Sequence, residues 1–292
     1  MKLILISNLL LSLILPIGVF AKETNNSENK KDSKVMNYVH PSEKLSKLSK
    51  SKKQLWVVGY VNSTLEDSIK DLDQSFNNGA DAVVLESGDY KKLDETIGAL
   101  KKKFPKKVLG VNFLGPDEKL FTYKETFELA KKHDLQIAWT DFSGVDQINE
   151  AKDESLHDIL NSKPENVFYV SGIHMKYSTL KNPNKAIELS ALQAMGWVDG
   201  IVITGPKTGV ATDPDRARRA RSVIGQYPMG AASGVSSENV NTILPYIDFV
   251  LVNSSIADKN HRVIGEKVKE LRKALDATSF SADQSVHQEV KE

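Results

Sequence analysis

Short apolar segments recur along the chain, separated by longer segments in which apolar residues return at helical spacing. One longer segment carries Leu65, Ile69, Leu72 and Phe76, the three-to-four-residue spacing of a helix with one buried face. The short segments have the length of strands, and they lie at 55–61, 82–85, 108–113, 137–140, 167–173, 201–204, 228–232 and 249–252. Strands that alternate with helices favour parallel βαβ units, so the pattern predicts eight such units.

The predicted strands are apolar at consecutive positions, which is typical of strands that are buried on both faces. Eight units of this kind predict an α/β fold, a closed (β/α)8 TIM barrel with parallel strands. The alternative is an open doubly wound sheet, which usually carries a Gly-rich turn after its first strand. The turn after the first strand here is Asn62-Ser63-Thr64, which does not match a dinucleotide-binding turn.

The ends of the chain differ from this repeating part. Residues 3–20 are nearly all apolar and Val19-Phe20-Ala21 fits a cleavage site, so 1–21 predicts a signal peptide. An uncleaved membrane anchor is the alternative, because the apolar run approaches spanning length. Composition predicts a disordered Lys/Ser/Asn-rich linker over 22–53, the barrel over 54–276 and a flexible polar tail over 277–292. We therefore expect export to the periplasm or the extracellular space, with membrane contact only through the N-terminal segment if that segment is uncleaved.

Charge and composition exclude several classes of function. The formal net charge is +1, so no strong field points to nucleic acid as a partner. The chain has no cysteine, which excludes disulfides, thiol catalysis and a Cys-ligated metal. The sequence determines no cofactor, and it leaves assembly into a homo-oligomer open.

The turns after the last three predicted strands are rich in glycine and hydroxyl residues. Small residues let backbone N–H groups approach an anion, and the loops after the last strands of a TIM barrel are its usual phosphate site. We therefore predict a site for a small phosphorylated molecule formed by Thr204, Gly205, Thr208, Gly209, Ser233, Gly234, Asn253, Ser254 and Ser255.

Polar residues at the ends of earlier strands supply candidate catalytic groups, because the carboxyl ends of barrel strands meet at one mouth. They are Glu86, Asn112, Asp141, His174 and Lys176. Alternation along the strand places His174 and Lys176 on the same side, as an acid–base or anion-binding pair if that side faces inward. A divalent metal on Glu86, Asp141 and His174 is an alternative, although the metal content stays unknown. Two further expectations are a solvated helix face carrying Arg216 to Arg221 and a surface position for His261.

Several of these motifs, taken in order, resemble the BtpA family of TIM-barrel proteins, named for a factor implicated in photosystem I biogenesis, and SgcQ-type proteins. The most specific matches are Thr204-Gly205 with Thr208-Gly209, Ser233-Gly234-Val235 with Glu238-Asn239-Val240, and Asn253-Ser254-Ser255-Ile256. Weaker matches are Glu86-Ser87-Gly88-Asp89, Gly110-Val111-Asn112-Phe113-Leu114 and Ile173-His174-Met175-Lys176. The resemblance implies a TIM barrel. Ala232 and Asn253 stand where the family usually has glycine, so we expect side chains to enter the phosphate turns.

Taken together, the sequence predicts a BtpA-like barrel that binds a small phosphorylated metabolite, a sugar phosphate or a nucleotide, at its C-terminal mouth. Isomerase, lyase and hydrolase chemistry all stay open. The alternative is a non-catalytic exported binding or assembly factor on the same scaffold, because fold does not decide function.

Overall fold

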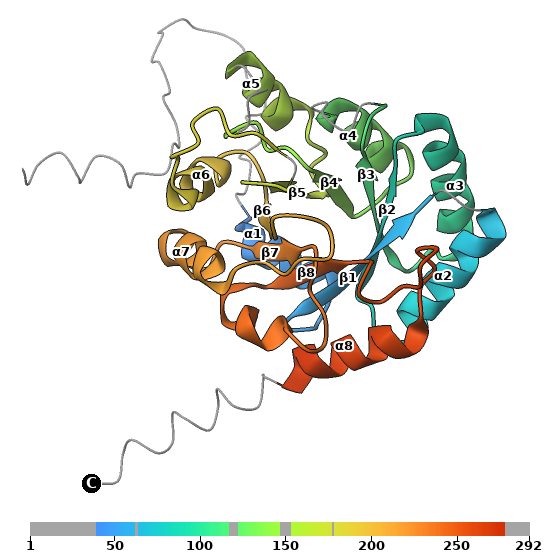
Figure 1. The fold of residues 1–292 in the computed structure, drawn as a ribbon. Helices are drawn as coiled ribbons and strands as arrows, with labels where there is room; N and C mark the ends of the chain where they lie inside the picture. The colour runs from blue at the N-terminus through green and yellow to red at the C-terminus, as the bar shows by residue number, and fades with distance from the viewer. Residues whose placement is uncertain (1–38, 62–63, 117–121, 147–152, 177, 278–292) are drawn as a thin grey trace, which may run out of the picture. The chain divides into compact units, whose positions relative to one another are not determined.

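The computed structural model describes residues 39–61, 64–116, 122–146, 153–176 and 178–277. Their eight strands close into a single parallel barrel in sequence order, each hydrogen-bonded to the next and β8 to β1 (Figure 1). This confirms the predicted (β/α)8 TIM barrel. The predicted signal peptide, most of the predicted linker and nearly all of the predicted tail lie outside the described residues.

The elements alternate along the chain as predicted. The strands are β1 Gln54–Tyr60, β2 Ala82–Ser87, β3 Val108–Phe113, β4 Ile137–Thr140, β5 Phe168–Gly172, β6 Gly200–Thr204, β7 Met229–Ala232 and β8 Phe249–Val252. The helices are α1 Pro41–Leu48, α2 Leu65–Asn77, α3 Tyr90–Lys103, α4 Tyr123–Lys132, α5 Asp153–Ser162, α6 Ile187–Ala194, α7 Pro214–Ile224 and α8 Gly265–Ala277. None of the helices in the described residues is both long and apolar enough to cross a membrane.

The connection from β7 to β8 departs from the expected α-helix. It holds two short 3-10 helices, η1 Val240–Thr242 and η2 Leu244–Tyr246. Pro245 lies inside the segment, and the residue before a proline is disfavoured in the α conformation, so a continuous helix cannot form there. The apolar residues Val240, Ile243 and Leu244 are nevertheless buried.

Large aromatic rings fill the barrel interior. Trp56 stacks on Phe249 with ring centroids 4.3 Å apart, and Phe168 meets both rings edge-on. Glycines on facing strands make room for them: a Cβ on Gly230 would lie 2.2 Å from the Phe249 ring, and one on Gly200 would lie 3.1 Å from Phe168. The interior is therefore packed by pairing large and small residues.

Three aspartates join neighbouring strands at the N-terminal end of the barrel. Asp81, Asp199 and Asp248 each precede a strand by one residue and accept a backbone N–H from the strand before it, at 2.7, 3.0 and 3.0 Å. Each carboxylate also forms an ion pair with a basic side chain; the partners are Arg272 for Asp81, Lys163 and Lys44 for Asp199, and Arg221 for Asp248. These groups serve the fold, because they lie at the end opposite the mouth.

The helix α1 corrects the expectation of disorder for residues 41–48, which lie within the predicted linker over 22–53. Its N-cap is His40, whose ring accepts the N–H of Ser42. Leu45 is 8% exposed and belongs to the cluster that fills the barrel interior. The carbonyl of Leu45 accepts from Gln54 Nε2 at 2.8 Å. Figure 1 shows α1 behind β6 to β8, where it covers the N-terminal end of the barrel.

Candidate active site

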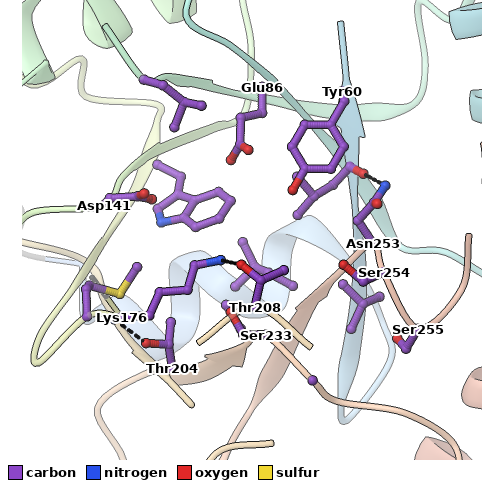
Figure 2. A pocket seen from close by; sticks show the side chains of 18 of the residues that line it. Tyr60, Glu86, Asp141, Lys176, Thr204, Thr208, Ser233, Asn253, Ser254 and Ser255 are labelled. Carbon is purple, nitrogen blue, oxygen red and sulfur yellow. Dashed lines mark hydrogen bonds between the residues drawn. The ribbon is translucent and has the colours of Figure 1, made fainter. Parts of the chain in front are cut away.

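A cavity of about 310 Å³ opens at the C-terminal ends of the strands (Figure 2). Most of the residues predicted from sequence line it; they are Glu86, Asp141, Lys176, Thr204, Thr208, Ser233, Gly234, Asn253, Ser254 and Ser255. Asn112, His174, Gly205 and Gly209 are not among its lining residues. Convergence of the strand ends explains the agreement, because the lining positions lie in the C-terminal halves of the strands or in the loops that follow them.

Two carboxylates share one side of the cavity. Glu86, at 7% exposure, points inward from β2, and Asp141 directly follows β4. Between them lies Asn112, which is 1% exposed and whose Nδ2 donates to Glu86 Oε2 at 2.9 Å and to Asp141 Oδ1 at 3.3 Å. Asn112 therefore lies behind the cavity and orients both carboxylates.

Lys176 brings a cation to the same cavity. Its backbone N–H donates to Thr204 Oγ1 at 2.8 Å, and its Nζ donates to Thr208 Oγ1 at 3.0 Å. Figure 2 shows the side chain extended across the cavity towards Thr208. The side chain therefore lies where it can meet a ligand anion as a point charge.

His174 does not join Lys176 in the cavity, so the predicted pair is wrong. The strand β5 ends at Gly172, alternation stops there, and His174 takes a φ of 45°. Its backbone N–H donates to Asp146 Oδ2 at 3.0 Å, and its Nε2 hydrogen-bonds with Ser190 Oγ at 3.1 Å. Burial, reinforced by Arg216, lowers the pKa of His174 to about 4. At neutral pH it is a neutral group beside α6.

The same placement removes the metal alternative. A site on Glu86, Asp141 and His174 needs all three side chains around one point, and His174 faces Ser190 instead. Within the described ranges, no cluster of three His, Cys, Asp or Glu residues could hold a metal ion.

Arg218 of α7 is exposed, as predicted, but the other arginines of α7 differ from the expected solvated face. Arg216 donates from Nη1 to the carbonyl of Thr204 and from Nη2 to that of His174, both at 3.2 Å. Arg219 forms a bidentate pair with Glu188, and Arg221 bonds to Asp248. Arg216 thus ties the chain after β5 to the end of β6, and this supports the turn that carries Lys176.

Left-handed backbone shapes the turn after β7. Ser233 and Gly234 take φ values of 69° and 63°. A Cβ on Gly234 would lie 2.2 Å from the carbonyl carbon of Val210, and one on Gly205 would lie 1.9 Å from the Val210 oxygen. Both glycines therefore allow close packing of the loop after β6. Gly209, with a φ of 77°, is exposed in that loop and does not reach the cavity.

Asn253 enters the cavity wall as expected from its size, and its amide is bonded to protein. Nδ2 donates to the carbonyl of Val58 at 2.8 Å, and Oδ1 hydrogen-bonds with Nδ1 of His261 at 3.2 Å. His261 is exposed, as predicted, yet its ring also contacts Tyr60 with centroids 5.0 Å apart. Asn253 therefore links β8 to β1.

Sequence reasoning missed Tyr60 and Trp139, which also line the cavity. Both were recoverable from strand alternation: Trp56, Val58 and Tyr60 share the inner face of β1, and Ile137 and Trp139 share that of β4. The sequence alone does not single them out, because an aromatic residue in a strand more often packs in the core than contacts a ligand.

Comparison with known proteins supports the fold. No protein-family profile and no curated protein sequence matches the chain. Phosphoribosyl anthranilate isomerase from Thermus thermophilus has a TM-score of 0.53 and 18% identity, over 77% of this chain and 99% of that one. KDPG aldolase from Legionella pneumophila has a TM-score of 0.54 and 15% identity, over 82% and 98%. Tryptophan synthase from Mycobacterium tuberculosis has a TM-score of 0.54 and 13% identity, over 77% of this chain and 93% of that one. At these identities the similarity establishes a TIM-barrel fold alone.

Proposed function

We propose that the cavity binds a small phosphorylated metabolite and that Glu86 or Asp141 exchanges a proton with it. The observation that carries the proposal is convergence: Lys176, the turn at Ser233 and Gly234, and the turn at Ser254 and Ser255 border the same cavity as the two carboxylates. A phosphate is bound by a cation and by N–H or hydroxyl donors. This cavity is lined by Lys176, by hydroxyl side chains and by turns of small residues, which supply these groups.

Two further observations support the proposal. The turns at 233–234 and 253–256 are the motifs that resemble the BtpA family. Among the structural neighbours, the name of phosphoribosyl anthranilate isomerase includes a phosphorylated group. The carboxylates add the chemistry: a positioned carboxylate can take a proton beside a carbonyl or from a hydroxyl, as isomerase and lyase reactions require.

The experiment places a negative charge in the turn at Ser233 and Gly234, where we propose that the phosphate binds. Ser233→Asp adds a carboxylate to the cavity, and Asp tolerates the positive φ of this position. We expect the thermal midpoint of the wild-type chain to rise with glycerol phosphate or inorganic phosphate, because a ligand at about 100 times its Kd adds roughly 2.7 kcal/mol. The Asp variant should lose this rise through charge repulsion.

Ser233→Asn is the matched control, because it has the size and backbone tolerance of Asp without the charge. We expect it to keep part or all of the ligand-induced rise. A rise that survives equally in both variants, or that is absent from the wild-type chain, would contradict phosphate binding at this turn.

A further inference from the structure

The two sides of the cavity have opposite chemistry. Glu86 and Asp141 approach from the ends of β2 and β4, whereas Thr208, Ser233, Ser254 and Ser255 follow β6 to β8 (Figure 2). Apolar side chains, among them Met175 and Leu251, also line the cavity. A ligand that fills the cavity therefore meets hydrogen-bond donors at one end and anionic acceptors at the other.

We infer that the ligand is a small phosphate ester whose other end carries hydroxyl or amino groups, so a phosphorylated polyol, sugar or amino alcohol. This inference rests on the proposed function, since it assigns the phosphate to the β6–β8 turns. The hydroxyl or amino end then donates to Glu86 and Asp141.

The amide of Asn112 prepares the acidic side for this role. It donates to one oxygen of each carboxylate and so fixes both groups without neutralising either charge. A carboxylate can accept about four hydrogen bonds, so several donors can share each of these groups. Because Glu86 is almost fully buried, a ligand donor that reaches it does so away from bulk water, where a charge-assisted hydrogen bond is strong.

The same geometry disfavours two other ligand classes. A phosphocarboxylate carries a second anion, which would lie against Glu86 and Asp141 and be repelled. A nucleotide adds a base and a ribose, and the cavity of about 310 Å³ is at the small end of the range for ligand pockets, about 300–1,000 Å³.

The side chain of Trp139 forms part of the cavity wall. It is 6% exposed, and among the described residues its indole N–H has no acceptor.

The test compares glycerol phosphate with phosphoglycerate, two ligands of similar size that differ by an alcohol and a carboxylate. Calorimetry on the full chain should show glycerol phosphate binding at least about tenfold more tightly, with adenosine monophosphate weaker still. Glu86→Gln keeps the shape and removes one charge. We expect it to lower the affinity for glycerol phosphate and to raise the affinity for phosphoglycerate. The ratio of the two affinities should therefore shrink or reverse, while the affinity for inorganic phosphate changes little.

Asp141→Asn is the second variant and should shift the ratio in the same direction. If all three phosphate esters bind but neither variant changes the ratio, the inference is wrong and the proposed function stands. If inorganic phosphate and every ester fail to bind the wild-type chain, the proposed function itself is wrong.

Discussion

At the scale of single residues, the interior of this barrel depends on glycines as much as on aromatic rings. Gly230 faces the ring of Phe249 across β7 and β8, and Phe249 in turn stacks on Trp56. Interiors are close-packed, so neither ring can retreat without disturbing the other. Position 230 requires glycine because there is no room for a side chain, and not because of its backbone angles.

Gly230→Ala should therefore destabilise the protein. A Cβ 2.2 Å from the ring forces a shift in Phe249, and overpacking of this kind costs about 1–3 kcal/mol. Urea unfolding followed by fluorescence measures the loss. Gly196→Ala is the control, because its Cβ would meet nothing closer than the Gln193 carbonyl at 3.6 Å. Equal midpoints for Gly230→Ala and the wild-type chain would contradict this account of the packing.

At the scale of elements, α1 shows how a polar segment gains structure from its neighbours. An isolated helix of eight residues is unstable in water. Here Leu45 enters the interior cluster, and Lys44 pairs with Asp199 at 3.1 Å beneath β6. The helix covers the end of the barrel opposite the cavity, so we expect it to contribute to stability without affecting ligand binding.

Leu45→Ala tests that role, because Leu45 is the α1 side chain buried within the interior cluster. Loss of a buried leucine side chain should lower the free energy of unfolding by about 2–4 kcal/mol. Lys47→Ala, on the exposed side of α1 with 63% of its side chain accessible, should have little effect. Both variants should keep the ligand affinity of the wild-type chain. A normal unfolding midpoint for Leu45→Ala would show that α1 is dispensable.

At the scale of the whole molecule, the two ends of the barrel have separate tasks. Ion pairs of Asp81, Asp199 and Asp248 join strands at the N-terminal end, while polar groups at the other end surround the cavity. His174 belongs to neither set. It holds the chain after β5 in place through Asp146, through Ser190 of α6 and through its carbonyl, which accepts from Arg216 of α7.

Folding keeps His174 neutral, and this predicts an acid-sensitive stability. The folded pKa of about 4 lies below the ordinary value of 6.5, so between these values the unfolded chain binds a proton that the folded chain does not. The free energy of unfolding should therefore fall as pH drops from 6.5 towards 4.5, by about 2 kcal/mol. Urea unfolding at several pH values measures the slope.

His174→Asn is the matched variant, because Asn also tolerates a positive φ and does not titrate. It should be less dependent on pH in this window. Carboxylates with lowered pKa, such as Asp94 and Glu188, release their stabilisation only at lower pH, near and below their ordinary values of 3.8 and 4.5. An unchanged slope in His174→Asn would assign the acid sensitivity to other groups.

The sequence by itself determined the barrel and the location of its cavity. Strands at 108–113, 137–140 and 249–252 have the predicted bounds, because burial on both faces of a parallel strand leaves a continuous apolar run. Glu86, Asp141 and Ser233 could be assigned to one cavity because the carboxyl ends of the strands in a closed parallel barrel converge.

Only the tertiary structure decided what lies beyond the strand ends. His174 turns away because β5 stops at Gly172, Arg216 reaches the carbonyls of His174 and Thr204, and α1 forms against the barrel interior. The physical reason is the range of the forces involved. The burial pattern of a strand or helix is determined by residues that are close together in the sequence. The direction of a loop side chain depends instead on partners that lie far away in the sequence.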